Sequence, residues 1–91
     1  MQKLSTADIQ QGLKELKGWQ LDGEALKKEW TFKNFKEALQ FINKVGVIAE
    51  KQNHHPEIHN VYNHLTLRYY THAIGGLTHR DFRAAAEIDK L

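Results

Sequence analysis

Apolar residues recur at helical spacing in three stretches of the chain and alternate with polar residues in two stretches between them. The first helical stretch begins at Ser5, which stands three residues before Asp8 in a capping-box arrangement, and Gly18 ends it. Residues 19–32 alternate on both sides of a turn at Asp22-Gly23, and this pattern predicts a β-hairpin.

The second helical stretch is the longest. It begins after Asn34, a capping residue, and Glu37 supplies an acidic third position. Apolar residues lie on more than one side of this stretch; we expect one face to pack on the sheet, and the role of the other face, burial or assembly, stays open. The helix must end before Pro56, the only proline, because proline disfavours a helical residue before it and donates no backbone hydrogen bond.

Residues 57–72 are rich in β-branched and aromatic side chains and predict a second hairpin, with its turn around Asn63-His64. Gly75-Gly76 breaks the pattern, and Thr78 caps a last helix. Strands that come as two hairpins, rather than singly between helices, favour an antiparallel sheet. We therefore expect an α+β fold, a single domain over residues 1–91 in which a four-stranded antiparallel sheet has three helices packed on one face.

Composition narrows the classes of protein to consider. The chain has 91 residues, no cysteine and a formal net charge of +2, with basic and acidic residues interspersed. No apolar run approaches the roughly 18 residues of a membrane span, and neither a secretory signal nor a disulfide framework suggests export. We expect a cytoplasmic protein with no membrane role. The small charge also lacks the basic footprint of a nucleic-acid-binding protein.

All six histidines lie within one stretch of the second half of the chain. His54, His55, His59 and His64 raise the question of a metal site, because imidazole is a common zinc ligand. Pro56 prevents His55 and His59 from lying one helical turn apart, and residues four apart on a strand are separated by about 13 Å. The spacing therefore argues against a bound metal.

A hairpin that turns at Asn63-His64 would place His55 opposite His72, with His54 close by. The three histidines then meet at the open end of the hairpin, beside Glu50 in the last turn of the long helix. Two interpretations stay open: polar residues at strand ends, or an acid/base site. The remaining histidines are expected to face solvent or turns: His59, His64 and His79.

Histidine accepts and donates protons near neutral pH, so two histidines on opposite sides of a substrate can remove one proton and deliver another. This chemistry suits the elimination of water. Nucleophilic catalysis has little support, since there is no cysteine and the one serine caps a helix. Asp81 stands three residues after Thr78, where a capping-box role is favoured over chemistry.

A fixed spacing links the candidate residues in the segments EKQNHHPEIHNVY and THAIGGLTHRD. The spaced positions are Glu50, His54-His55-Pro56, Tyr62, His72 and Asp81. With this pattern, and with WTFKNFKEALQFINKVGVIAE before it, the chain resembles the pterin-4a-carbinolamine dehydratase family. In mammals this family is also described as a dimerization cofactor of a homeodomain transcription factor.

The resemblance implies the same α+β fold and a cofactor-free hydro-lyase. Such an enzyme dehydrates 4a-hydroxytetrahydrobiopterin to quinonoid dihydropterin and so recycles tetrahydrobiopterin. The resemblance assigns catalysis to His54, His55 and His72 without a metal; we expect His54 and His72 to share the acid and base roles while His55 orients the substrate. The expected substrate-binding or supporting residues are Glu50, Asn53, Pro56, Tyr70 and Asp81. Asn53 and Tyr70 depart from the mammalian residues, which leaves the side chain of the pterin open.

The main alternative is a non-catalytic module, a homodimer or homotetramer that presents its long helix to a partner protein. The free edges of a four-stranded sheet and the small core favour self-association under either interpretation. A single-stranded nucleic-acid surface around Arg68, Tyr69 and Tyr70 is disfavoured, because Tyr69 shares its strand face with Leu65 and Leu67.

Overall fold

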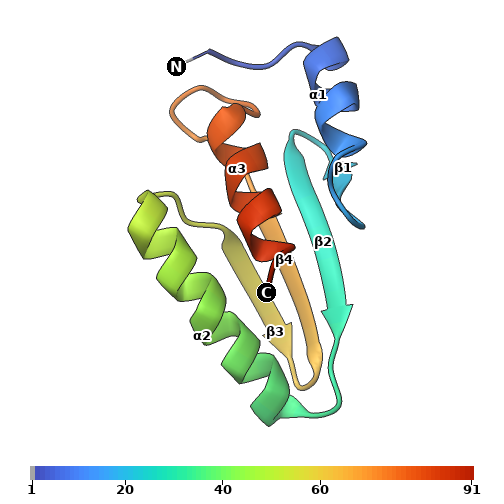
Figure 1. Cartoon of the computed structure of the whole chain (residues 1–91), viewed down its shortest axis with the longest axis vertical. Coiled ribbons are helices and arrows are strands. Elements are labelled where there is room, and N and C mark those ends of the chain that lie inside the picture. Colours follow the sequence, from blue (N-terminus) through green and yellow to red (C-terminus); the bar gives the residue numbers. More distant parts are fainter. Residues whose placement is uncertain (1) are drawn as a thin grey trace.

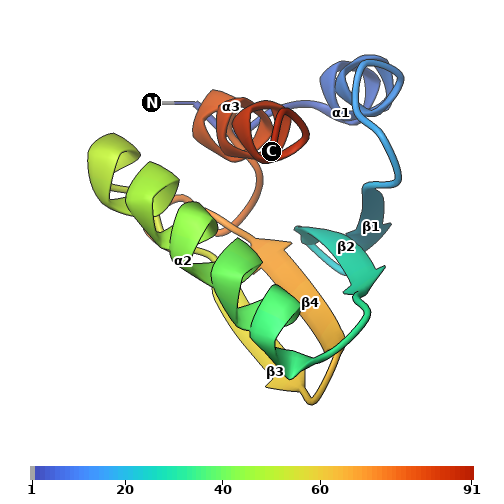
Figure 2. The same ribbon diagram turned by 60° about the horizontal axis from the view of Figure 1, so that its bottom comes forward.

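The computed structural model describes residues 2–91 and has the expected order of elements (Figure 1). The helices and strands are α1 (Thr6–Leu13), β1 (Gln20–Asp22), β2 (Ala25–Thr31), α2 (Phe35–Gln52), β3 (Glu57–Val61), β4 (His64–Tyr69) and α3 (His79–Ile88). The strands form one antiparallel sheet in the order β1-β2-β4-β3. Figure 2 shows the three helices on one side of this sheet, so the predicted α+β fold is confirmed.

The hydrophobic core lies between the inner face of the sheet and the helices. Every second residue of β4 is buried, namely Leu65, Leu67 and Tyr69, and Leu26 of β2 lies beside them. The helices contribute Val45, Ala84, Ala85 and Ile88. Because Tyr69 is fully buried, it cannot serve as a stacking platform for bases, in agreement with the sequence.

The capping box expected at the start of α1 is present, but the helix ends at Leu13 rather than at Gly18. The backbone N–H of Lys17 donates a hydrogen bond to the carboxylate of Asp89, at 2.9 Å. In a continued helix the same N–H would bind the carbonyl of Leu13. A contact with a residue 72 positions away therefore accompanies the early end of α1, and local sequence gives no sign of it.

Asp89, directly after α3, is the centre of a polar cluster. Its carboxylate accepts hydrogen bonds at 2.9 Å from the Lys17 N–H, the Trp19 Nε1–H and the Lys28 ammonium. Burial raises the pKa of Asp89, but the hydrogen bonds from Lys17, Lys28 and Trp19 and the charge of Lys28 outweigh it. The pKa of Asp89 is therefore held below its ordinary value.

We expect Asp89→Asn to lower the free energy of unfolding at pH 7 by about 1–3 kcal/mol, because hydrogen bonds to a charged group are lost. Since folding lowers this pKa, the carboxylate stabilises the protein above its unfolded pKa of about 3.9. That stabilisation disappears as the pH falls through the folded pKa, so the two proteins should converge in acid. Urea unfolding at several pH values measures this.

The control for Asp89→Asn is Glu87→Gln, two residues earlier, in the last turn of α3. The carboxylate of Glu87 contacts the exposed Lys90 at 3.2 Å, and exposed pairs contribute little. Glu87→Gln should change stability by less than about 0.5 kcal/mol. An Asp89→Asn variant as stable as the wild type at pH 7 would contradict the proposed contribution of the cluster.

The long helix α2 begins and ends where the sequence predicts, but it buries one face only. The side chain of Asn34 accepts a hydrogen bond from the Glu37 N–H at 2.9 Å, and the helix stops at Gln52, before Pro56. Its buried residues are Ala38, Val45 and Ala49. Phe35, Leu39 and Val47 remain 46%, 42% and 69% exposed. One face of α2 thus packs on the sheet as expected, and the other face, left open by the sequence, stays exposed in this chain because all three helices form a single layer. No helix within residues 2–91 has the length and apolar character of a membrane span.

The second hairpin turns at Tyr62-Asn63, so its register differs from the expected one. Val61 pairs with His64 and Glu57 pairs with Arg68, where the expected register would pair Glu57 with Tyr70. The peptide N–H of Phe32 donates to the Asn63 carbonyl at 2.8 Å, and the Asn63 amide donates back to the Phe32 carbonyl at 2.8 Å. This contact with the end of β2 holds Asn63 inside the turn.

Candidate active site

The chain turns sharply between α2 and β3, and this turn carries two of the candidate histidines. Asn53 ends α2 in the left-handed conformation, with φ of 50°, which asparagine adopts more readily than most residues. The backbone N–H of His54 then donates to the carbonyl of Ala49 at 3.1 Å. As a result the side chain of His54 is buried, with 8% of the residue exposed, while the next residue, His55, lies at the surface.

The imidazole of His54 is held by a buried carboxylate. Nε2 of His54 lies 2.6 Å from Oδ1 of Asp81, which is fully buried. The other carboxylate oxygen, Oδ2, accepts hydrogen bonds from the Thr71 hydroxyl at 2.7 Å and from the Thr78 N–H at 3.0 Å. The Asp81 carboxylate accepts hydrogen bonds from Thr71 and Thr78 and has no proton to donate when ionised. His54 is therefore the donor in its contact with Asp81, through Nε2–H, and Nδ1 is left as an acceptor.

Asp81 therefore has two structural roles. It completes the capping box with Thr78 at the start of α3, as the sequence predicts. It also binds His54, although its position after Thr78 favours the capping role over a role in chemistry. The charge of Asp81 also affects Tyr69. Burial is the main cause, and the Asp81 carboxylate the second, of a Tyr69 pKa that is raised to about 12.

His55 is paired with the carboxylate expected beside it. Nε2 of His55 lies 2.5 Å from Oε2 of Glu50, in the last turn of α2. Both side chains are exposed, His55 by 53% and Glu50 by 80%. The pair can orient the His55 ring, but solvent screens its charges.

His72 comes from the other side of the site, in the segment after β4. Its ring packs edge-on against Tyr70, with centroids 4.8 Å apart, and it has no hydrogen-bond partner among residues 2–91. His54, His55 and His72 all line one open hollow of about 310 Å³. The complete lining is Asn53, His54, His55, Tyr70, Thr71, His72, Ala73 and Arg80. The three histidines are thus brought together although the predicted register was wrong.

The expected supporting residues divide into two groups. Asn53 and Tyr70 line the hollow itself. Glu50 and Asp81 do not line it and act through His55 and His54. Pro56 lies directly before β3, outside the lining.

The sequence did not predict three residues of this lining: Thr71, Ala73 and Arg80. The guanidinium of Arg80 donates to the carbonyl of Asn53 at 2.5 Å and to that of Gln52 at 3.4 Å. It thereby ties the first turn of α3 to the end of α2. The available signal was position: Arg80 directly precedes Asp81, and Thr71 directly precedes His72.

Two further features of the described residues bear on the site. Within residues 2–91, no three side chains of the His, Cys, Asp or Glu type are arranged to hold a metal ion.

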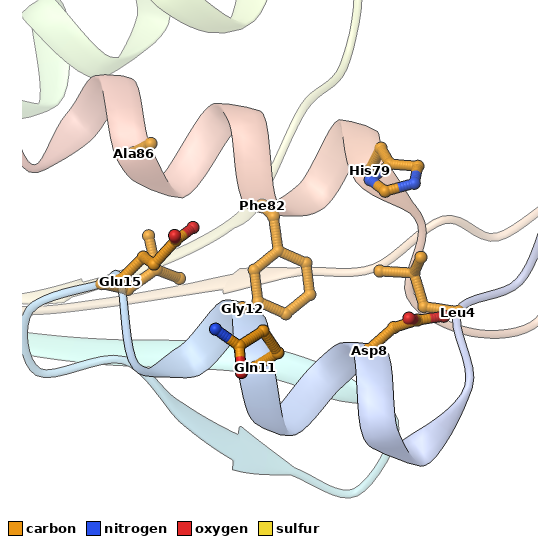
Figure 3. A pocket seen from close by; sticks show the side chains of 9 residues that line it. Leu4, Asp8, Gln11, Gly12, Glu15, His79, Phe82 and Ala86 are labelled. Carbon is orange, nitrogen blue, oxygen red and sulfur yellow. The ribbon is translucent and has the colours of Figure 1, made fainter.

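A second hollow, of about 320 Å³, lies between α1 and α3 (Figure 3). In it the Phe82 ring lies against Gly12, where an added Cβ would come within 2.6 Å of the ring. This hollow shares no lining residue with the histidine hollow.

Comparison with known sequences gives a consistent result. Residues 2–91 match the family described as pterin 4 alpha carbinolamine dehydratase. A relative from Nitrosospira multiformis is 43% identical over all of this chain and 80% of its own length. One from Sulfurisphaera tokodaii is 42% identical over all of this chain and 98% of its own. Both relatives are named provisionally as pterin-4-alpha-carbinolamine dehydratases.

Two solved structures are also similar. The crystal structure of a transcriptional coactivator/pterin dehydratase from Brucella melitensis has a TM-score of 0.93 at 34% identity and covers 98% of this chain and 97% of its own. A pterin dehydratase-like protein described as a RuBisCO assembly factor in the alpha-carboxysome has a TM-score of 0.70 at 18% identity, over 84% of this chain and 90% of its own, and supports the fold alone. On its sequence, its fold and the match over residues 2–91, the chain belongs to the pterin 4 alpha carbinolamine dehydratase family.

Proposed function

We propose that this protein is a 4a-hydroxytetrahydropterin dehydratase that uses histidine general acid/base catalysis. The substrate, 4a-hydroxytetrahydrobiopterin or a related pterin, loses water to give the quinonoid dihydropterin, which can be recycled to the tetrahydropterin. The observation that carries the proposal is the single hollow lined by His54, His55 and His72. Family membership supports the reaction class.

The reaction needs one proton removed and one delivered. A base takes the proton from N5, the electrons of the N5–H bond form the N5=C4a double bond, and the C4a–O bond breaks. An acid protonates the departing hydroxyl, which leaves as water. No bond to the protein is required at any point.

The contacts of the histidines suggest how the two roles are divided. His54 donates Nε2–H to Asp81, so its free Nδ1 suits it to act as the base, and the buried carboxylate stabilises the imidazolium that forms. The imidazole of His72 has no hydrogen-bond partner in residues 2–91 and suits the acid that protonates the hydroxyl. His55, paired with Glu50, orients the substrate.

The proposal is tested by stopped-flow absorbance with synthetic 4a-hydroxytetrahydrobiopterin near pH 7, in buffer with a chelator. The uncatalysed dehydration in the same buffer is the baseline. Acceleration by the wild-type protein supports the dehydratase, whereas a rate equal to that of buffer would leave the enzyme proposal without support.

A second candidate role, a homo-oligomer that binds a partner protein, is favoured by the exposed apolar residues Phe35 and Leu39 of α2. We expect self-association into a dimer or tetramer, because these side chains would otherwise stay in water. Sedimentation equilibrium should give a mass above that of one chain, and Leu39→Lys, with Lys14→Gln as a surface control, should reduce it. A wild-type protein that sediments as a single chain at high concentration would contradict this expectation.

A further inference from the structure

The histidine hollow has two neighbouring hollows on the side of α2 and α3. His54 and Arg80 line both this hollow and a small neighbouring one of about 20 Å³, to which Gln52 and Arg83 also belong. Gln52 and Arg83 in turn line a groove of about 560 Å³ that also includes Lys51. The helices α2 and α3, which form this groove, lie side by side on the sheet in both views (Figures 1 and 2). We call these neighbouring spaces, which share lining residues, the α2–α3 path.

The α2–α3 path is positively charged. Lys51 and Arg83 are exposed and form no ion pair within residues 2–91. Arg80, at the junction with the histidine hollow, donates only to backbone carbonyls and so keeps its full charge. The one carboxylate in the lining is Glu87, which is paired with Lys90 at 3.2 Å. Three cations therefore outnumber one partly neutralised carboxylate.

The opposite side of the histidine hollow has a different character. Tyr70 and His72 also line a hollow of about 250 Å³ that contains Glu24 and Glu57. The single cation there, Arg68, is already bound to Glu57 at 2.7 Å and to Asp22 at 2.9 Å. This side can accept hydrogen bonds but would repel an anion.

A pterin has matching polarity. Its pyrimidine end carries a 2-amino group and a ring N–H, which are hydrogen-bond donors suited to carboxylates, whereas the substituent at C6 lies at the other end of the bicycle. The cations of the α2–α3 path are not needed by the uncharged ring. They do suit a phosphate, which guanidinium groups bind with two parallel hydrogen bonds.

We propose that the α2–α3 path receives an anionic substituent on C6 of the pterin, so that the preferred substrates are pterin carbinolamines with a phosphorylated side chain. Arg83 and Lys51 bind the phosphate, and Arg80 supplies charge where the path leaves the histidine hollow. This inference rests on the proposed dehydratase function for the placement of the ring at His54, His55 and His72.

The first test compares the binding of two oxidised probes, neopterin and neopterin 3′-phosphate, by quenching of pterin fluorescence at low salt. The phosphorylated probe should bind about tenfold more tightly to the wild type, as expected for one charge-assisted contact. The double variant Arg83→Gln/Lys51→Gln should bring the ratio of the two dissociation constants close to one. Added salt should do the same.

The matched control is Lys44→Gln, which removes one positive charge from an exposed site on α2 that does not line the path. It should leave the ratio as in the wild type. Equal binding of the two probes by the wild type, or a ratio that the double variant does not change, would overturn the proposal. Circular dichroism confirms that each variant is folded.

Kinetics separate this inference from the proposed function. With the phosphorylated carbinolamine the double variant should raise KM and leave kcat within about twofold, because the phosphate contact is remote from the reacting atoms. If the wild type accelerates dehydration but does not prefer the phosphorylated probe, the dehydratase proposal is supported and phosphate binding in the α2–α3 path is overturned. A preference for the phosphorylated probe without any acceleration supports the path and removes the proposed function.

Discussion

His54→Gln is expected to lower kcat/KM for pterin carbinolamine dehydration by about 100-fold to 10,000-fold, the range that general base catalysis contributes. Glutamine can still donate to the buried carboxylate of Asp81 through its amide N–H, but it cannot accept the N5 proton. His54→Ala is a poorer choice, because it would leave a buried carboxylate without its partner at 2.6 Å. The measurement is stopped-flow absorbance near pH 7, corrected for the uncatalysed rate.

Three other substitutions calibrate this result. His72→Ala should cause a loss of similar size without affecting folding, since His72 is exposed and its side chain makes no hydrogen bond within residues 2–91. His55→Ala should cost about tenfold, because we assign it to orientation. His59→Ala, on β3 outside the hollow, should behave as the wild type. A folded His54→Gln protein with the wild-type rate would exclude His54 as the base.

Asp81→Asn is expected to affect both stability and activity. The carboxylate is fully buried and bonded to His54, Thr71 and Thr78. Removing its charge should lower the free energy of unfolding by about 2–4 kcal/mol, measured by urea denaturation. It should also lower kcat by at least about tenfold, because an asparagine stabilises the His54 imidazolium less well than a carboxylate.

A readout other than activity distinguishes positioning of His54 from a purely structural role. Nitrogen-15 chemical shifts should report the Nε2–H form of His54 in the wild type, and a mixture of both neutral forms in Asp81→Asn, since an asparagine can also donate to Nε2. Thr71→Val is the matched control. It removes one donor at 2.7 Å but keeps the charge, and should retain the Nε2–H form. An unchanged form of His54 in Asp81→Asn would rule out the positioning role.

Local signals in the sequence predicted the elements well. Ser5, Asn34 and Thr78 each cap the helix expected after them, because a capping side chain binds backbone N–H groups only two or three residues away. The helix α2 ends before Pro56, as the sequence predicts, with Asn53 in the left-handed conformation at its C-terminus. The alternation of Leu65, Leu67 and Tyr69 correctly predicted which face of β4 is buried.

The errors arose where distant residues decide. The early end of α1 coincides with a hydrogen bond from Lys17 to Asp89. The register of the second hairpin coincides with hydrogen bonds between Asn63 and Phe32. The convergence of the three histidines was still predicted, since two of them precede β3 and the third follows β4. Arg80 was missed because its partners are backbone carbonyls at the end of another helix, and backbone carbonyls leave no trace in a sequence.

The shared carboxylate of Asp81 also has a consequence for the order of events during synthesis of the chain. His54, His55 and His72 all leave the ribosome before the residue that orients the first of them. Until residue 81 has emerged and the last helix has begun on its cap at Thr78, the nascent chain carries every proposed proton-transfer group without a fixed arrangement. The start of that helix and the orientation of His54 therefore depend on the same carboxylate, and both are completed only when Asp81 takes its place in the folded chain.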